Sequence, residues 1–253
     1  MKCAIVTATD KKYLPGVKAL YASCIKNTTP VDFYLFAHGA EEDFEEVQGR
    51  AMKILYNKDT IASPTSSEWL EEIPAMYSRL MIPRILSDYD RVLWLDADVL
   101  VLKDLTELFS IDMESHAVAG QIAHRPNSPY DKFNFMPYQF EEPSKFPEYE
   151  NVYGIQAGVV LFDIKNWQKT DYDAAVDAAL ISGIKFKFVV QGLLGYVLKG
   201  DFKHIPNKWN AKLSTITNPS QASVLHYVGG AGQNPWETRM KFGDLWQEYY
   251  RRF

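Results

Sequence analysis

The sequence alternates short apolar runs with segments of helical spacing, and this order most constrains the fold. The apolar runs have strand length: CAIVTA (3–8), DFYLFAH (32–38), KILYN (53–57), RVLWL (91–95), AVAGQIA (117–123) and GVVLFDI (158–164). The segments with helical spacing are YLPGVKALYASCIKN (13–27), EEDFEEVQGR (41–50), AMYSRLMIPRIL (75–86) and DLTELFSID (104–112). Such alternation predicts an α/β fold, with a mainly parallel sheet and helices on both of its faces.

Length and charge narrow the class of protein further. A chain of 253 residues with 47% hydrophobic residues is typical of one globular domain over residues 1–253. The net charge is −5 and no long Lys/Arg run is present, so we expect no nucleic-acid partner. The amino terminus reads as a strand rather than a signal peptide, and no apolar run reaches about 18 residues. We therefore expect a cytoplasmic protein.

Two carboxylates, Asp96 and Asp98, stand at the end of an apolar strand, in RVLWLDADVLVLKDL (91–105). In open α/β sheets, ligands bind at the carboxyl ends of the strands. One residue separates the two carboxylates, so in extended geometry they point to the same side. A divalent cation would balance their repulsion, and this predicts a metal site. Repulsion alone also predicts that Asn at either position does not lower the stability of the metal-free protein.

The residues themselves leave other chemistries open. An aspartyl phosphatase of the haloacid dehalogenase type also places D-x-D-x-[TV] after an apolar strand, and DADVL resembles that pattern. Such an enzyme also needs a downstream Lys and a paired acidic motif, for which Lys199 and Asp201 are isolated candidates. This phosphatase is the first alternative. A non-catalytic protein that binds sugar nucleotides is the second.

Several further motifs carry a family resemblance that covers most of the chain. They are YSRLMIPRIL (77–86), YDRVLWLDADVLVLKDLTELF (89–109), IQAGVVLFDIKNW (155–167), IPNKWN (205–210) and VLHYVGG…NPW (224–236). Together they resemble the retaining glycosyltransferases of family 8, the group that contains glycogenin and bacterial lipooligosaccharide galactosyltransferases. The resemblance implies a Rossmann-like, GT-A type fold that binds a nucleotide sugar. It implies a nucleotide-binding half (1–110) ending in D-x-D and an acceptor and catalytic half (111–253) with a carboxyl-terminal helix.

The resemblance also implies the reaction. A hexose, most plausibly from a UDP-hexose donor, passes to a hydroxyl of a carbohydrate, glycolipid or glycoprotein acceptor with retention of anomeric configuration. A metal ion held by Asp96, Asp98 and His226 bridges the donor diphosphate. Carboxylates with an imidazole suit Mn²⁺ better than Ca²⁺, and Mg²⁺ is the alternative ion. No second carboxylate is assigned as nucleophile, so we expect front-face attack by the acceptor.

The implied site residues fall into two sets. Gln191, near the anomeric carbon, and Asp98 are the expected catalytic residues. The expected donor-binding residues are Ala8, Asp10, Tyr13, Arg79, Asp96, Ala97, Gln156, Gly229 and Arg239. Asp10 is expected to hydrogen-bond uracil and Tyr13 to stack on it, although Tyr13 packing at a helix start is the alternative. Arg79 suits phosphate or sugar oxygens, with a salt bridge to a nearby acid as its alternative.

The chain departs from the family pattern at two positions. The family's Asp-Gln pair beside the donor sugar is Val190 and Gln191 here, so one carboxylate is missing. The family's Lys before Pro-Trp is replaced by Asn234. If the chain is an active transferase, Arg79 or Arg239 is then expected to supply the missing positive charge at the diphosphate.

Two segments suggest further contacts. Residues 124–152 contain five prolines and seven aromatic residues, and we expect them to close over the donor or to form part of the acceptor site. The carboxyl-terminal FGDLWQEYYRRF (242–253) is aromatic and basic. It is expected either to pack on its own domain or to make a weak peripheral contact with an anionic membrane.

Overall fold

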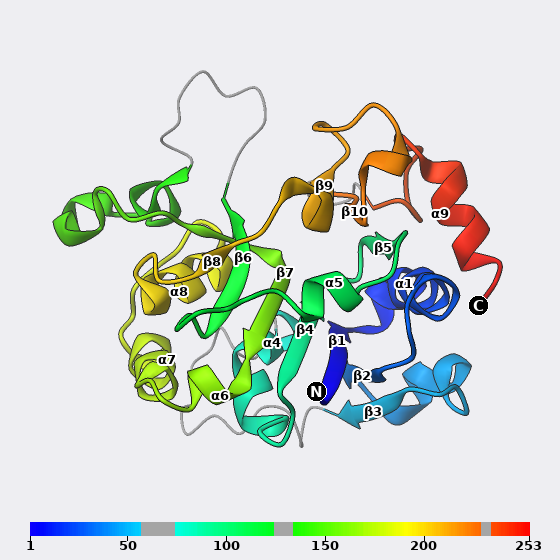
Figure 1. Ribbon diagram of the computed structural model, residues 1–253, viewed down its shortest axis with the longest axis horizontal. Coiled ribbons are helices and arrows are strands. Elements are labelled where there is room, and N and C mark those ends of the chain that lie inside the picture. Colours follow the sequence, from blue (N-terminus) through cyan, green and yellow to red (C-terminus); the bar gives the residue numbers. More distant parts are fainter. Residues whose placement is uncertain (57–73, 124–133, 229–233) are drawn as a thin grey trace.

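The computed structural model describes residues 1–56, 74–123, 134–228 and 234–253. At its centre lies a seven-stranded sheet (Figure 1). In spatial order its strands are β3 (Lys53–Tyr56), β2 (Asp32–Ala37), β1 (Cys3–Thr9), β4 (Arg91–Leu95), β7 (Ile155–Asp163), β6 (Val118–Ile122) and β8 (Lys203–His204). β7 runs antiparallel to both neighbours, and all other pairings in this sheet are parallel. The predicted α/β class and mainly parallel sheet are confirmed.

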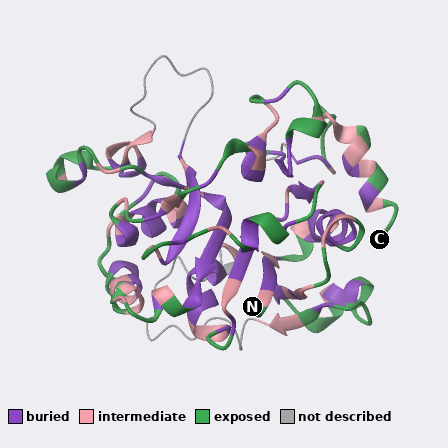
Figure 2. Cartoon of the chain, in the orientation of Figure 1, coloured by how far each residue is buried: buried purple, intermediate pink, exposed green. Residues whose placement is uncertain are grey.

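Helices cover both faces of this sheet, and its inner strands β1, β4, β7 and β6 are mostly buried between them (Figure 2). Along β4, Val92 and Trp94 pack with the helices on one face, whereas Leu93 and Leu95 pack on the other. This follows from the two-residue repeat of a strand, because a strand covered on both faces needs apolar residues at every position. The helices are α1 (Leu14–Asn27), α4 (Pro74–Ile85), α5 (Thr106–Phe109), α6 (Ile164–Trp167), α7 (Tyr172–Ile181), α8 (Val189–Leu198) and α9 (Gly243–Tyr250).

A second, three-stranded sheet was not predicted from the sequence. Its order is β5 (Val99–Val101), β10 (Val224–His226) and β9 (Ala211–Lys212). β10 runs antiparallel to β5 and parallel to β9. Because β5 begins directly after the D-x-D segment, this small sheet brings residues near 211 and 226 beside residues 96–98.

Two of the predicted helices differ in the structure. Residues 41–50 were expected to be α-helical, but η2 (Glu41–Val47) is a 3₁₀ helix. Its buried residues, Phe44 and Val47, are three apart, which matches the 3₁₀ repeat, and the other side chains of η2 are mostly acidic. The helix expected over 104–112 is limited to α5, where the Asp104 carboxylate accepts a hydrogen bond from the Thr106 N–H (2.7 Å).

The described part of the aromatic segment, residues 134–152, folds into three short 3₁₀ turns: η4 (Met136–Gln139), η5 (Pro143–Lys145) and η6 (Pro147–Tyr149). Phe140 and Tyr149 are buried and pack on Tyr196 of α8. Phe135 remains partly exposed and stacks on Tyr153 at a centroid distance of 4.8 Å. Some of these aromatics therefore stabilise the fold and others face solvent. Residues 124–133 lie outside the described residues.

The carboxyl-terminal helix α9 packs against α1 (Figure 1). Trp246 and Tyr249 are buried, and the Tyr249 hydroxyl accepts a hydrogen bond from Asn27 Nδ2 (2.7 Å). Arg251 and Arg252 are exposed, as are Asp244 and Glu248, whereas Trp246 and Tyr249 serve intramolecular packing. In the described residues, no helix combines the length and the apolar character that crossing a bilayer requires. The expected cytoplasmic location stays a prediction.

His38, just beyond β2, gives the fold a pH dependence. It is 5% exposed, its Nε2 lies 2.7 Å from Ser78 Oγ, and burial lowers its pKa to about 4. An unfolded His titrates near about 6.5, so stability is complete above that pH and is lost as the pH falls toward 4. We expect His38→Gln, which keeps a hydrogen-bonding group, to lose less stability than the parent between pH 7.5 and 5, as measured by urea unfolding. Equal losses in both proteins would contradict this role of His38.

Candidate metal and donor site

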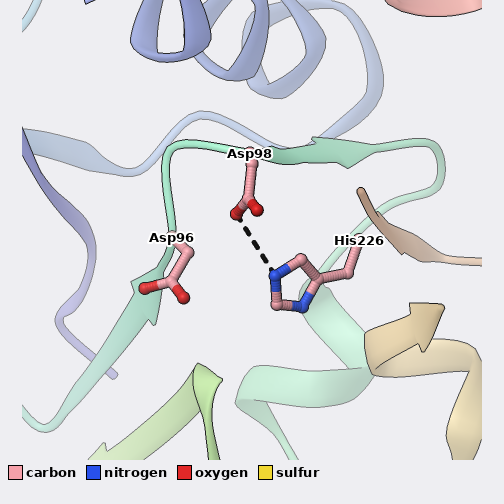
Figure 3. A group of neighbouring side chains, drawn as sticks. All are labelled: Asp96, Asp98 and His226. Carbon is pink, nitrogen blue, oxygen red and sulfur yellow. Dashed lines mark ion pairs between the residues drawn. The ribbon is translucent and has the colours of Figure 1, made fainter. Parts of the chain in front are cut away.

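Three side chains from three elements meet at the carboxyl end of β4 (Figure 3). Asp96 follows β4, Asp98 precedes β5 and His226 ends β10. The strand register explains the meeting, because His226 lies opposite Val99 and the Tyr227 N–H donates to the Asp98 carbonyl (2.9 Å). One ligand atom of each residue lies within 4.8 Å of the others, and His226 Nε2 is 3.2 Å from Asp98 Oδ1. The predicted ligand set is therefore brought together.

A chain of amides orients the His226 ring. Its Nδ1 lies 2.8 Å from Asn210 Oδ1, while Asn210 Nδ2 donates to Gln156 Oε1 (2.6 Å). Gln156 Oε1 also accepts from the Gly158 N–H (2.8 Å). Since Asn210 presents an oxygen to the ring, Nδ1 carries the proton and Nε2 keeps a lone pair for a metal.

Gly158 keeps open the space between two of these ligands. A Cβ at this position would lie 2.2 Å from His226 Cε1 and 3.0 Å from Asp96 Oδ2. A side chain here would therefore displace the imidazole. Two carboxylates, an imidazole with its Nε2 turned inward, and a glycine that leaves room beside them fit a divalent cation such as Mn²⁺ or Mg²⁺.

Arg79 on α4 forms an ion pair with Asp96. Its guanidinium lies 2.9 Å from Asp96 Oδ1, donates to the Ala157 carbonyl and stacks over the Trp94 ring at 4.4 Å. Trp94 Nε1 donates to the same Asp96 oxygen (2.8 Å). Burial lowers the pKa of the Arg79 guanidinium and the Asp96 charge opposes this shift. The salt-bridge alternative for Arg79 is thus present, and one oxygen of Asp96 is occupied by protein donors.

The first turn after β1 carries two of the predicted base-binding residues. Asp10 Oδ1 accepts from the Tyr13 N–H (3.0 Å) and so caps η1 (Lys11–Tyr13). The Tyr13 ring packs edge-on against Trp236, with centroids 5.4 Å apart. Ala8 lies half-buried near the end of β1. The packing alternative for Tyr13 is therefore observed, while Asp10 itself remains exposed.

Gly16 lets helix α1 approach the D-x-D turn. A Cβ on Gly16 would lie 2.4 Å from the Ala97 carbonyl oxygen and 2.7 Å from the Trp236 ring. Ala97 is buried in this contact. The amino-terminal helix, the D-x-D turn and the Pro-Trp motif thus meet at one place, as the family resemblance implies for a donor site.

Gln191 of α8 contacts β7 at Ala157, next to Gly158. Its Oε1 accepts from the Ala157 N–H (3.4 Å) and its Nε2 donates to Gln139 Oε1 (3.1 Å). Val190, where the family has Asp, is 1% exposed and packs in the core. The contact between Gln191 and Gln139 could not be predicted from the sequence, because Gln139 lies in the irregular segment.

Other predicted donor residues are less closely joined to this group. Arg239 is exposed on the surface beside Trp236, and within the described ranges no hydrogen bond or ion pair links it to Asp96, Asp98 or His226. Gly229 lies outside the described residues. Asn234 is buried and its Nδ2 donates to Glu237 Oε2 (2.7 Å), so it stabilises the turn that presents Trp236.

Solved glycosyltransferases share this fold. The galactosyltransferase LgtC, solved with donor and acceptor sugar analogs, superposes with a TM-score of 0.72 at 21% identity and covers 98% of this chain and 95% of its own. The apo glycosyltransferase GlyE of Streptococcus pneumoniae gives 0.70 at 19% identity, covering 99% of this chain and 60% of its own. The sheet order and the carboxylate pair at its edge define a glycosyltransferase fold of the GT-A type.

Sequence comparison then gives the family. The model for "Glycosyl transferase family 8" matches residues 4–239. The lipopolysaccharide 1,2-glucosyltransferase of Escherichia coli K12 is 26% identical over 260 residues, which cover 92% of this chain and 72% of that protein. General stress protein A of Bacillus subtilis is 21% identical, covering 94% of this chain and 88% of its own. The chain belongs to glycosyl transferase family 8 and is a retaining glycosyltransferase.

The phosphatase alternative is not favoured. Asp201 accepts a hydrogen bond from the Tyr172 hydroxyl (2.8 Å) and lies 2.6 Å from His116 Nδ1. Lys199 forms the carboxyl-terminal cap of α8. Both residues thus have structural roles, and Asp96, which would be the nucleophile, is already bound by Arg79.

Proposed function

We propose that the enzyme transfers a hexose from a UDP-hexose to an acceptor hydroxyl, with a divalent cation, Mn²⁺ or alternatively Mg²⁺, held by Asp96, Asp98 and His226. The observation that carries this proposal is the convergence of two carboxylates and an oriented imidazole at the carboxyl end of β4. A metal bound there would stabilise the charge of the leaving diphosphate. The family membership supports sugar transfer itself.

The protein groups around this site have distinct tasks in the proposal. Asn210 keeps the proton on His226 Nδ1, so Nε2 faces the ligands. Arg79 and Trp94 hold one Asp96 oxygen in place and leave the other for coordination. Gln191, positioned by Gln139, lies beside the transferred sugar and stabilises the developing charge without forming a covalent bond. Attack by the acceptor from the front face then retains the anomeric configuration.

The wider assignments follow from the same proposal. Residues 1–110 would bind the nucleotide through Ala8, Asp10, Tyr13 and Ala97, and residues 111–253 would bind the acceptor, a carbohydrate, glycolipid or glycoprotein. The exposed aromatics of residues 134–152 would contact sugar rings, in which case donor and Mn²⁺ slow proteolysis of this segment. Arg251 and Arg252, both exposed, would contribute any peripheral contact with an anionic membrane.

A thermal-shift screen tests the proposed donor. UDP-glucose, UDP-galactose and GDP-mannose are each compared with and without Mn²⁺. Ligand at 100 times its dissociation constant adds about 2.7 kcal/mol to apparent stability, so a UDP-sugar should raise the melting temperature by several degrees only with metal. The UDP-sugar proposal would be contradicted if a UDP-sugar raised the melting temperature equally with Mn²⁺ and with EDTA. It would also be contradicted if GDP-mannose were the only one of the three sugars to raise it.

Arg239 is the proposed replacement for the missing lysine. A donor diphosphate needs positive charge beyond one metal ion, and a charge-assisted phosphate contact contributes about 1.5–3 kcal/mol. We expect Arg239→Ala to weaken donor binding by about tenfold. Adding Asn234→Lys to the Arg239→Ala variant should restore part of the lost affinity. Titration of UDP into the single and double variants measures this. Unchanged UDP affinity in Arg239→Ala would leave the role to Arg79.

A further inference from the structure

A pocket of about 280 Å³, lined mainly by residues with polar side chains, adjoins the metal group. It lies where the carboxyl end of β6 meets η7 (Asn207–Asn210) and β9, and its lining residues are Gln121, Ile122, Asn134, His204, Asn207, Asn210, Lys212 and Thr215. Asn210 belongs to both the pocket and the metal group, because it lines the pocket and its Oδ1 accepts a hydrogen bond from His226 Nδ1. Pockets for drug-sized ligands measure about 300–1,000 Å³, so this one suits a single sugar-sized group.

Lys212 is the cationic side chain among the described residues that line this pocket. β9 pairs with β10 so that Lys212 lies directly opposite His226, and paired residues project from the same face of a sheet. The Lys212 side chain therefore lies next to the metal ligand rather than on the outer surface. Burial lowers the pKa of its ammonium to about 8, which reflects lost hydration.

The other lining groups also favour an anion. Gln121 Nε2 donates to Asn207 Oδ1 (2.9 Å), so Asn207 keeps its Nδ2 group as a donor for a ligand. Thr215 adds a hydroxyl and His204 a ring nitrogen. Among the described lining residues there is no Asp or Glu, so no carboxylate of the pocket wall would repel an anionic ligand.

We propose that this pocket selects acceptors that carry a carboxylate or phosphate group, which Lys212 binds beside the reacting hydroxyl. This inference rests on the proposed function, since it takes the metal group as the donor side of the same site. It adds the chemical class of the acceptor: an acidic or phosphorylated sugar rather than a neutral one.

Binding of three matched glycosides tests the proposal. Methyl glucoside, methyl glucuronide and methyl glucoside 6-phosphate are titrated into the full chain saturated with UDP and Mn²⁺, so that the donor side is filled. At least one anionic glycoside should bind about tenfold or more tightly than the neutral one, and the better of the two tells carboxylate from phosphate. Equal binding of all three would overturn the proposal.

Variants assign the preference to the pocket. Lys212→Met should abolish the preference for the anionic glycoside, and Lys212→Arg should retain it. Lys169→Met, an equal charge change on the exposed surface, should retain it as well. A preference that survives Lys212→Met would overturn the proposal. If UDP failed to bind to the parent protein, the proposed function would be contradicted instead. The glycosides would then be titrated without UDP, so that the anion preference of the pocket is still measured.

Discussion

Asp98→Asn is expected to lower metal-dependent sugar transfer by about 10³-fold while leaving the stability of the metal-free protein unchanged. Loss of one of three ligands removes several kcal/mol of electrostatic stabilisation, and each 1.36 kcal/mol is about tenfold in rate. Asp98 is partly exposed, and its Oδ1 lies 3.2 Å from His226 Nε2. Initial rates of UDP release at several Mn²⁺ concentrations measure the effect.

Asp96→Asn should lower transfer similarly but should also destabilise the protein, by about 1–3 kcal/mol. Repulsion between the two carboxylates alone predicts no loss of stability. For Asp96 the structure leads us to expect a loss instead, because its charge balances the buried Arg79 guanidinium. Urea unfolding without metal measures the free energy of unfolding of Asp96→Asn and Asp98→Asn, and only Asp96→Asn should lower it. Asp88→Asn, at an exposed position, is the control. Near-normal, Mn²⁺-dependent rates in both variants would exclude the metal site.

Gly158→Ala is the second change with a large expected effect. The added Cβ would lie 2.2 Å from His226 Cε1, so the imidazole must move. Misplacing a catalytic group by about 1 Å can cost about 10²-fold in rate, and overpacking costs about 1–3 kcal/mol of stability. We expect Mn²⁺ affinity and transfer both to fall, as measured by metal titration and UDP release.

Gly243→Ala is the matched control for this change, because nothing lies within 4 Å of its added Cβ. It should leave Mn²⁺ affinity and transfer unchanged. If Gly158→Ala kept the parent's Mn²⁺ affinity, His226 would not be a ligand in the arrangement described.

The central sheet could be predicted because its strands are covered on both faces and so carry unbroken apolar runs, as in RVLWL. Asp96 and Asp98 could be predicted as a pair at the end of an apolar strand, but the extended geometry expected for them is wrong, because Ala97 and Asp98 form a turn between β4 and β5. The position of His226 required the family resemblance, since nothing local shows that β10 pairs with β5.

Contacts between distant segments were beyond the sequence analysis. A salt bridge to a nearby acid was one of the two roles expected for Arg79. The effect of this salt bridge on the stability of Asp96 variants depends on the burial of Arg79, which residue spacing in the sequence does not show. Asn210 stood in the quoted IPNKWN motif, yet its bond to His226 depends on the turn from η7 into β9. Lys212 was missed because two-residue strands such as β9 have too few residues to show a periodicity.

Titration of UDP with and without Mn²⁺ tests the central claim most directly. If Asp96, Asp98 and His226 hold a metal that bridges the donor diphosphate, UDP and Mn²⁺ must each strengthen the binding of the other. Isothermal titration should then give one UDP per chain with Mn²⁺ and an affinity at least about tenfold weaker with EDTA. This difference should disappear in Asp98→Asn. A UDP affinity that is the same with Mn²⁺ and with EDTA in the parent protein would contradict the account.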